Sequence, residues 1–529
     1  MIRTNKISSG TYGIAYSAKA SKDDKTEVAI KRNIVDADIS FSGSIRELDL
    51  LNRLRGHPYI VKLLSVSFGN PFVQPNSPIP SRKNSEYRED YLHFIMELGK
   101  QNLHSLIYEK VVHVAYLKLA MVQTLLAIEY MHAKGVVHRD IKPANLLWFN
   151  NDDRGTVKLC DFGLSKIFTG QEPKSPHMVT CWYRAPEICA HHENYSFESD
   201  MWSIGVVFYE MIARNALLIG SKDDDTRLLS KIIGILPSPE HKDILKMIRD
   251  GNKQGVSPIK LGKEASPRFR KTWKTMINLS VADIEEFNRY PSNEANYDNF
   301  LDLLDKLLQL NPEKRLTASQ ALSHEFFTPY QNIIEWSRTN YPPIGKDEHL
   351  VEIFNCTERK WATKLAFTIF NDRTSLTWYR HRIIFQSIDM FDRYLIFIKN
   401  EKKEEKLESE YSGKYMTRYE TQLRYVVCLY ICIKYFTTLN APISFLDLAT
   451  AEYKTPKAMI EAEEFEKRML RDVLKFKIFR ETVFECNDRR GIILSELKIR
   501  DLLYHYGTSS SIRDVKLSDL LSSLLSKVL

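Results

Sequence analysis

The 529-residue sequence is poor in cysteine and in long apolar segments. Its seven cysteines are scattered and odd in number, which favours free thiols in a reducing compartment over a disulfide framework. We expect no membrane-spanning segment, because no apolar run approaches the roughly 20 residues that a spanning helix requires. Residues 1–6 lack the apolar core of a secretory signal peptide. These absences predict an intracellular protein, either cytoplasmic or nuclear.

The sequence also lacks a dense cluster of basic residues. Its 75 Lys and Arg residues and 67 Asp and Glu residues give a formal charge of +8, which is modest for this length. We therefore predict neither nucleic acid nor a membrane as a partner. The 43% hydrophobic and 27% charged residues are typical of a globular protein. Because 529 residues exceed one ordinary core, we expect two or three domains.

What the sequence does contain is a set of polar residues suited to phosphoryl transfer. Residues 138–145 read His-Arg-Asp-Ile-Lys-Pro-Ala-Asn, and residues 161–163 read Asp-Phe-Gly after a short apolar run. In this reaction one carboxylate orients the attacking hydroxyl and accepts its proton, while a carboxylate and an amide hold magnesium against the phosphates. We assign Asp140 to the first role, and Asp161 and Asn145 to the second. Two unrelated polar loops are the alternative interpretation.

These two motifs, in this order, resemble the catalytic loop and the Asp-Phe-Gly motif of protein kinases. The resemblance covers about residues 1–330 and implies the α+β bilobal protein kinase fold, with ATP and Mg2+ as cofactors. The small lobe is expected over about residues 1–99 and the large lobe over about residues 100–330. Lys142, two residues after Asp140, resembles the lysine of the serine/threonine-specific form of this loop.

A hairpin near the N-terminus is suited to a close approach of backbone to phosphate. Gly10 and Gly13 lie between alternating apolar positions. The segment resembles the kinase glycine-rich loop, with Ser8 where the family usually has its first glycine. Thr11 and Tyr12 match the pair that cyclin-dependent kinases phosphorylate to block activity.

The next strand pattern, residues 27–31, ends in Lys31, which by resemblance holds the α- and β-phosphates of ATP. Residues 42–51 are predicted to form a helix with one apolar face, and Glu47 on this helix is the natural partner of Lys31. The run Ser-Ile-Arg-Glu-Leu within it is similar to the cyclin-contacting helix of cyclin-dependent kinases. This similarity narrows the resemblance to that branch.

The resemblance further implies an adenine site next to a buried strand, residues 92–98, with Met96 as its gatekeeper. The backbone from Glu97 to Gly99 is expected to bind the base, with Ala15 and Ala29 above it and Leu147 beneath it. The complete set of nucleotide-binding residues is expected to be Ile7, Gly10, Gly13, Ala15, Ala29, Lys31, Glu97, Gly99 and Leu147.

The end of the activation segment, residues 179–187, is nearly the form seen in cyclin-dependent kinases. It places Ser175 where those kinases carry their activating phosphothreonine. A phosphate at this position requires a cluster of cations. Arg46 and Arg139 match two of the family's three arginines, but Lys166 stands at the third and lacks the bidentate fork of an arginine.

Two other matches imply structural roles. Asp200 is expected to brace the catalytic loop, and Arg315 is expected to pair with Glu187 of the Ala-Pro-Glu motif. Neither residue would touch the substrate.

After a linker predicted over residues 331–349, the composition changes. Little glycine or proline and much helical periodicity predict an all-α domain over residues 350–480 and a helical extension over residues 481–529. The domain resembles a cyclin box, most clearly in Asp-Arg-Tyr-Leu at 392–395 and in the apolar helix predicted over residues 423–435.

Two charged residues of this second domain match those with which cyclins hold the kinase. Lys434 ends the apolar helix, and Glu466 lies in a segment that resembles the start of the fifth cyclin-box helix. Both are predicted to form the interface with the kinase domain. Ordinary surface charges are the alternative interpretation.

Together these matches predict an ATP- and Mg-dependent serine/threonine kinase that is proline-directed and activated in cis by its fused cyclin-like domain. Its partners would be protein substrates with Ser-Pro or Thr-Pro sites. A tether of roughly twenty residues reaches up to about 70 Å and gives an effective concentration of order millimolar. The same tether permits a domain-swapped dimer.

Two alternatives remain open at this point. One is a catalytically inactive scaffold, in which Ser8 and Lys166 mark the loss of activity. The other is an active kinase whose helical domain docks outside proteins rather than activating the kinase.

Overall fold

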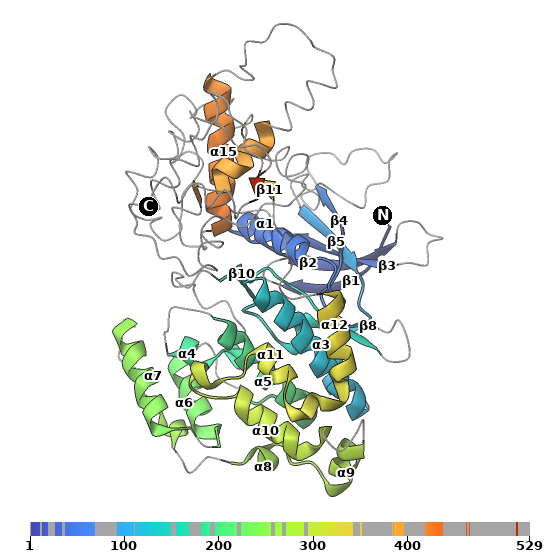
Figure 1. The fold of residues 1–529 in the computed structure, drawn as a ribbon, viewed down its shortest axis with the longest axis vertical. Coiled ribbons are helices and arrows are strands. Elements are labelled where there is room, and N and C mark those ends of the chain that lie inside the picture. Colours follow the sequence, from blue (N-terminus) through green and yellow to red (C-terminus); the bar gives the residue numbers. More distant parts are fainter. Residues whose placement is uncertain are drawn as a thin grey trace. The chain divides into compact units, whose positions relative to one another are not determined.

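A computed structural model of the chain divides it into two compact units, residues 1–34 with 54–345 and residues 35–53 with 346–529. The first unit holds most of the residues whose structure is described (Figure 1). The described residues are 2–10, 13–19, 27–33, 38–68, 92–109, 112–149, 155–168, 181–190, 196–218, 224–237, 239–254, 260–266, 271–289, 295–341, 350–351, 383–384, 386–395, 418–436, 462, 465 and 515–516.

The first unit begins with an antiparallel five-stranded sheet in the order β1-β2-β3-β5-β4. Its strands are β1 (Ile2–Gly10), β2 (Gly13–Lys19), β3 (Glu27–Asn33), β4 (Leu63–Phe68) and β5 (Leu92–Glu97). Alternating side chains of the inner strands meet in one core, in which Ala18, Ile30 and Ile95 are buried. The β1–β2 hairpin closes with Gly10 opposite Gly13, as the glycine pattern predicts.

The helical lobe of this unit is built around two apolar helices, α3 (Val114–Ala133) and α5 (Phe197–Ala213). Both are buried along most of their length. The expectation of no membrane-length apolar segment is wrong for α3, which by length and composition alone could cross a bilayer. Most of its residues are buried inside the lobe, because the other helices pack around it. It is a core helix.

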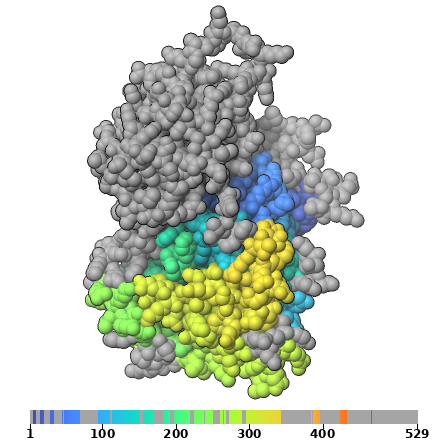
Figure 2. Space-filling view, viewed as in Figure 1, coloured from blue at the N-terminus to red at the C-terminus, as the bar shows by residue number. Residues whose placement is uncertain are grey.

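The remaining helices of the lobe pack around α3 and α5. The last of them along the chain, coloured yellow, gather on the face of the lobe that Figure 2 shows. They are α2 (Leu103–Glu109), α4 (Pro186–Cys189), α6 (Asp225–Ile235), α7 (His241–Gln254), α8 (Trp273–Ile277), α9 (Val281–Arg289), α10 (Tyr297–Leu307), α11 (Ala318–Leu322) and α12 (Gln331–Asn340).

Short strands between the sheet and the helices carry the polar motifs. A three-stranded sheet has the order β6-β8-β9, and β7 pairs with β10. Their bounds are β6 (Gln101–Asn102), β7 (Val136–Val137), β8 (Leu146–Phe149), β9 (Thr156–Leu159) and β10 (Lys166–Ile167). The loop from β7 to β8, with the 3-10 turn Pro143–Asn145, therefore holds the His-Arg-Asp motif.

The segment predicted as a linker, residues 331–349, is helical in its first part. These residues form α12, whose Ile334 is fully buried and whose Arg338 binds Glu129 of α3 at 2.6 and 3.0 Å. The two ends of this ion pair lie 209 positions apart, so sequence periodicity alone does not reveal it. Tyr341 belongs to the same unit, which therefore extends beyond residue 330.

The second unit contains α1 (Asp38–Arg53) and α15 (Arg418–Phe436), which pack against each other (Figure 1). The buried helix predicted over residues 423–435 is confirmed where side chains are described, since Leu423 and residues 425–432 are buried. A two-residue antiparallel pair, β11 (Leu350–Val351) with β12 (Val515–Lys516), adds strand structure that the all-α prediction did not include.

Candidate active site

The catalytic-loop motif forms a tight hydrogen-bonded unit around Asp140. Its carboxylate Oδ2 accepts from Lys142 Nζ at 2.7 Å and from Asn145 Nδ2 at 3.0 Å. Asn145 Nδ2 also donates to the Asp140 carbonyl oxygen at 2.8 Å. The three predicted residues are thus brought together, with the Asp140 carboxylate oriented by a cation and an amide. A carboxylate held in this way can accept a proton from a hydroxyl that approaches the loop.

Asp200, in the first turn of α5, binds the backbone of the catalytic loop. Its buried carboxylate accepts from the backbone N–H of His138 at 2.8 Å and of Arg139 at 2.9 Å, and contacts His132 Nε2 at 2.9 Å. This confirms the predicted bracing role of Asp200. Arg139 adopts a positive φ of 73°, a conformation that non-glycine residues rarely keep unless their surroundings impose it.

Asp161 follows β9 and faces Lys31 of β3. Lys31 Nζ lies 2.7 Å from Asp161 Oδ1, and Asp161 also has a positive φ, of 65°. Burial opposes ionisation of Asp161, but the Lys31 ammonium outweighs it and lowers the pKa of the carboxyl to about 2. Asp161 is therefore ionised at any ordinary assay pH. The pair brings together two residues that lie 130 positions apart.

The donor set fits a magnesium ion. Mg2+ prefers oxygen ligands and usually takes only one or two from protein side chains, the others coming from water and substrate phosphates. Asp161 supplies an anionic oxygen, and Asn145 uses its amide nitrogen internally, which leaves Oδ1 as its remaining polar atom. Among the described residues, no group of three or more His, Cys, Asp or Glu side chains is placed to hold a metal ion.

The strand register places the residues expected around the nucleotide close together. Ala15 of β2 lies opposite Lys31, and Ala29 of β3 lies opposite the predicted gatekeeper Met96. Ile7 of β1 is half exposed. Gly10 and Gly13 close the β1–β2 hairpin, and Glu97 ends β5.

Gly99 and Leu147 approach each other at the side of this region. A Cβ atom placed on Gly99 would lie 3.0 Å from the Leu147 Cβ, so a side chain at Gly99 would crowd the Leu147 side chain. Within the part of the chain that the structure describes, no carbonyl accepts the Gly99 N–H.

The predicted regulatory residues are spread over both units. Lys166 is buried in β10 beside β7, next to the catalytic loop that carries Arg139. Arg46 and Glu47 lie on α1 in the second unit, and both side chains are buried. Lys434 lies on α15. Thr11, Tyr12, Ser175 and Glu466 fall outside the described residues.

A buried ion pair stabilises the base of the activation segment. Arg315 donates to Glu187 Oε1 at 2.7 Å and Oε2 at 2.6 Å, which confirms the predicted pair. Ser199 Oγ adds a hydrogen bond to Oε1 at 3.0 Å. Burial opposes ionisation of Glu187, but the Arg315 guanidinium has the larger effect and lowers the pKa of the Glu187 carboxyl.

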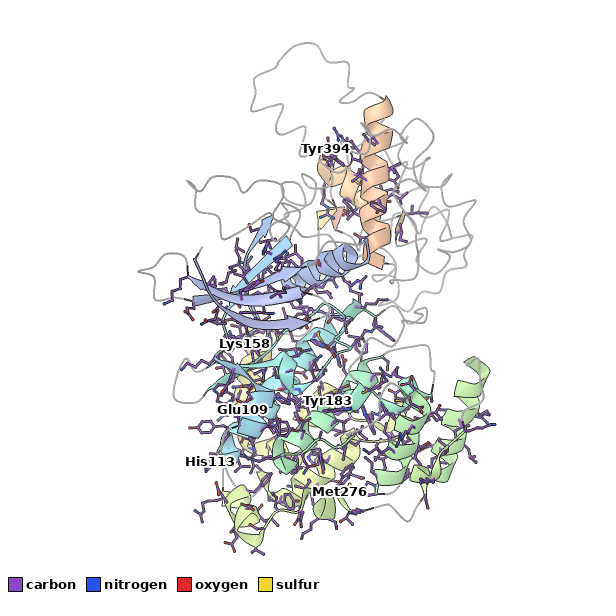
Figure 3. All side chains as sticks on the ribbon, turned by 180° about the vertical axis from the view of Figure 1, so that it is seen from behind. Glu109, His113, Lys158, Tyr183, Met276 and Tyr394 are labelled. Carbon is purple, nitrogen blue, oxygen red and sulfur yellow. The ribbon has the colours of Figure 1, made fainter. Side chains whose placement is uncertain are left out.

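Sequence reasoning missed a network beside the same segment. Glu210 of α5 is buried and accepts from Tyr108 OH and from Tyr183 OH, each at 2.7 Å (Tyr183 is labelled in Figure 3). The Ser203 hydroxyl also donates to the Tyr183 carbonyl at 2.8 Å. One signal was present in the sequence, since a glutamate inside an apolar helix needs buried partners.

A family model and several known proteins match the N-terminal part of the chain. The family model described as "Protein kinase domain" matches residues 1–327. The chain is similar to "Extracellular signal-regulated kinase 2" of Dictyostelium discoideum, 34% identical over 62% of this chain and 80% of the relative. It is also similar to "Mitogen-activated protein kinase HOG1A" of Wallemia ichthyophaga, 32% identical over 62% of this chain and 76% of the relative.

A cyclin-dependent relative resembles the chain to the same degree. "Probable cyclin-dependent kinase 10" of Dictyostelium discoideum is 31% identical over 65% of this chain and 83% of the relative. Mitogen-activated and cyclin-dependent kinases are thus about equally similar to the chain, and these comparisons do not single out the cyclin-dependent branch. The family match ends before the second unit's C-terminal residues begin.

Proposed function

Because this chain belongs to the protein kinase family, we propose that it transfers the γ-phosphoryl group of Mg-ATP to serine or threonine residues of proteins, and that its fused cyclin-like domain over residues 350–480 activates it in cis. The observations that carry the first part are the Lys31–Asp161 ion pair and the hydrogen-bonded cluster of Asp140, Lys142 and Asn145. A scaffold that had lost activity would have no need to keep both of these groups of contacts. Ser8 and Lys166 are local departures that leave this set intact.

Each residue of the set has one role in this proposal. Asp140 orients the substrate hydroxyl and accepts its proton, and Lys142 holds the Asp140 carboxylate while supplying charge next to the transferred group. Lys31 binds the α- and β-phosphates, and Asp161 with Asn145 holds Mg2+. When bound, Mg2+ neutralises charge on the phosphate oxygens.

The preference for Ser-Pro or Thr-Pro sites is supported by residues 179–184, which resemble those of proline-directed kinases, and by the similarity to mitogen-activated and cyclin-dependent kinases. Trp182 in this segment is more than a third exposed, while Tyr183 next to it is buried. An exposed aromatic side chain beside a fixed backbone is suited to contact with an extended peptide.

Activation in cis is supported by the burial of α1. Residues 46–51 are all buried, and six consecutive residues cover more than one turn of a helix, so every face of α1 is covered there. Arg46, Glu47 and Asp49 are among them, and buried charges of this kind are stable only when paired. Within the second unit, α15 packs on α1, in keeping with a cyclin-like role for that unit.

A short tether would favour this arrangement. The Tyr341 ring lies 5.5 Å from the ring of His57, which follows the end of α1 by four residues. The eight residues 342–349 separate Tyr341 from β11 of the second unit. Fully extended, they span only about 30 Å, far less than the reach of a twenty-residue linker. Such a tether gives an effective concentration of order millimolar.

The test uses the full chain with a protease site inserted within residues 342–349. Phosphorylation of a Ser-Pro peptide is measured before cutting, after cutting, and after dilution of the cut protein. Asp140→Asn is the blank, a Ser-Ala peptide tests the proline preference, and the uncut parent treated with protease is the control. A fall in activity on dilution, reversed by adding residues 346–529, would support activation in cis.

Two other outcomes would decide against parts of the proposal. Activity that is unchanged after cutting and dilution would make the C-terminal domain a docking module. Activity no greater than that of Asp140→Asn, with nucleotide and peptide varied, would favour the scaffold. Lys434→Glu and Glu466→Lys then test the predicted interface, with exposed Lys274→Glu as the matched control.

A further inference from the structure

A partly buried ion pair lies beside the proposed adenine site. Lys158 of β9 donates from Nζ to both carboxylate oxygens of Glu97, each at 2.8 Å. Their side chains are only 14% and 20% exposed, respectively. Figure 3 shows Lys158 between the five-stranded sheet and the helical lobe. Because Glu97 is the last residue of β5, this contact joins the start of the Glu97–Gly99 segment to β9, the strand that precedes Asp161.

The Glu97 carboxylate has a second partner, which supplies a third hydrogen bond. Its Oε1 accepts from the backbone N–H of Lys62 at 2.7 Å, and the Glu97 N–H donates to the Lys62 carbonyl at 3.1 Å. Glu97 is thus fixed on one side by the segment before β4 and on the other by β9. A carboxylate that accepts three charge-assisted or backbone hydrogen bonds holds its own backbone firmly in place.

Lys158 also supports the floor of the site. It lies opposite Leu147 in the β8–β9 ladder, and its Nζ lies 4.9 Å from the centre of the Phe149 ring. The Phe149 ring would lie 3.5 Å from a Cβ atom on Gly99. Lys158 therefore contacts the Glu97 carboxylate, and Leu147 and Phe149, which lie next to Lys158, would meet a side chain placed on Gly99.

We propose that Lys158 is a positioning residue for the nucleotide, which sets the Glu97–Gly99 backbone against the adenine through its ion pair with Glu97. This inference rests on the proposed function, since it concerns how that same site binds ATP. Lys158 does not itself touch the reacting atoms. Its loss should therefore weaken nucleotide binding while the phosphoryl-transfer step, which depends on Asp140 and Asp161, continues.

The experiment compares Lys158→Met, Lys158→Arg, Glu97→Gln and the charge swap Lys158→Glu with Glu97→Lys, all in the full chain. The probe is a fluorescent N-methylanthraniloyl ADP, whose Kd reports binding without catalysis, together with KM for ATP and kcat. Lys158→Met is expected to raise Kd and KM about tenfold, with kcat changed less than about threefold. Lys158→Arg and the charge swap should recover most of the affinity. Lys306→Met, which removes an exposed ion pair with Asp302, is the control.

Several results would overturn the inference. One is a Kd in Lys158→Met that equals the wild-type value. Another is a fall in kcat that matches the fall in the fraction of folded protein, with Kd unchanged. If Lys158→Met does not fold, Glu97→Gln and the charge swap decide instead. A wild-type chain that phosphorylates no better than Asp140→Asn would refute the proposed function, whereas normal wild-type activity with an unaltered Kd in the variants would refute only the role of Lys158.

Discussion

Acidification should loosen the aromatic cluster that anchors the end of the kinase unit. His57 is buried, stacks on the Tyr130 ring at 4.6 Å, and meets the edges of Tyr59 and Tyr341 at 5.7 and 5.5 Å. Its Nδ1 accepts from the Tyr59 N–H at 3.3 Å, which requires a neutral ring. Burial lowers the pKa of His57 to about 3, so the folded state binds this proton only in strong acid.

The sign and size of the effect follow from the two protonation states. Between pH 6.5 and pH 3 the opened state binds more protons than the folded state, so the free energy of opening falls as the pH falls through 6.5. From pH 7 to pH 5 this one group removes about 2 kcal/mol, which is a loss of about 25-fold in protection. The whole chain need not unfold, because opening at His57 is a local event.

Hydrogen exchange read by mass spectrometry measures this directly in peptides covering residues 54–62 and 331–341. After correction for the intrinsic pH dependence of exchange, the wild type should lose about 25-fold in protection between pH 7 and pH 5. His57→Phe keeps the stacking surface and should lose far less. Exposed His104→Gln is the matched control. Equal losses in the wild type and His57→Phe would refute the reasoning.

Three further predictions concern the framework of the site. Arg315→Met should lower the free energy of unfolding of the kinase unit by about 3–5 kcal/mol in calorimetry, because Glu187 is left buried and unpaired; a change under about 1 kcal/mol would contradict this. Asp200→Asn should lower kcat about ten- to hundredfold with little change in KM for ATP, since it weakens hydrogen bonds to the catalytic loop; an unchanged kcat in steady-state assays would argue against the bracing role. Gly155→Ala should destabilise the unit by more than Gly135→Ala in thermal unfolding, because both have positive φ but only the first would place a Cβ 2.0 Å from a tryptophan ring; equal losses would show that the ring moves aside freely.

Local sequence was sufficient for the residues that lie close together along the chain. Asp140, Lys142 and Asn145 occupy one tight loop, so their spacing already predicted that they would meet. Strand alternation predicted a strand that ends at Lys31, and the structure puts Lys31 within β3, which continues to Asn33, and next to Asp161. Only the family resemblance placed Lys31 and Asp161 at one site, because no local sequence pattern connects residues that lie 130 positions apart.

The predicted linker shows what local sequence did not predict. Residues 331–340 have the polar composition of a connecting segment, yet they form α12 because Ile334 and Arg338 find partners on the kinase lobe. Composition likewise made α3 a possible membrane helix, and only its burial among other helices identifies it as core. In both cases the surroundings of the helix decided its role.

The sequence by itself therefore determined the chemistry that the chain carries, since the motif residues and their local geometry follow from a few neighbouring positions. Only the tertiary structure decided which distant groups share a charge or a hydrogen bond. Lys158 with Glu97, and Tyr108 and Tyr183 with Glu210, are examples. The physical reason is that a buried charge must find a partner, but the partner it finds is set by which strands and helices the fold brings side by side.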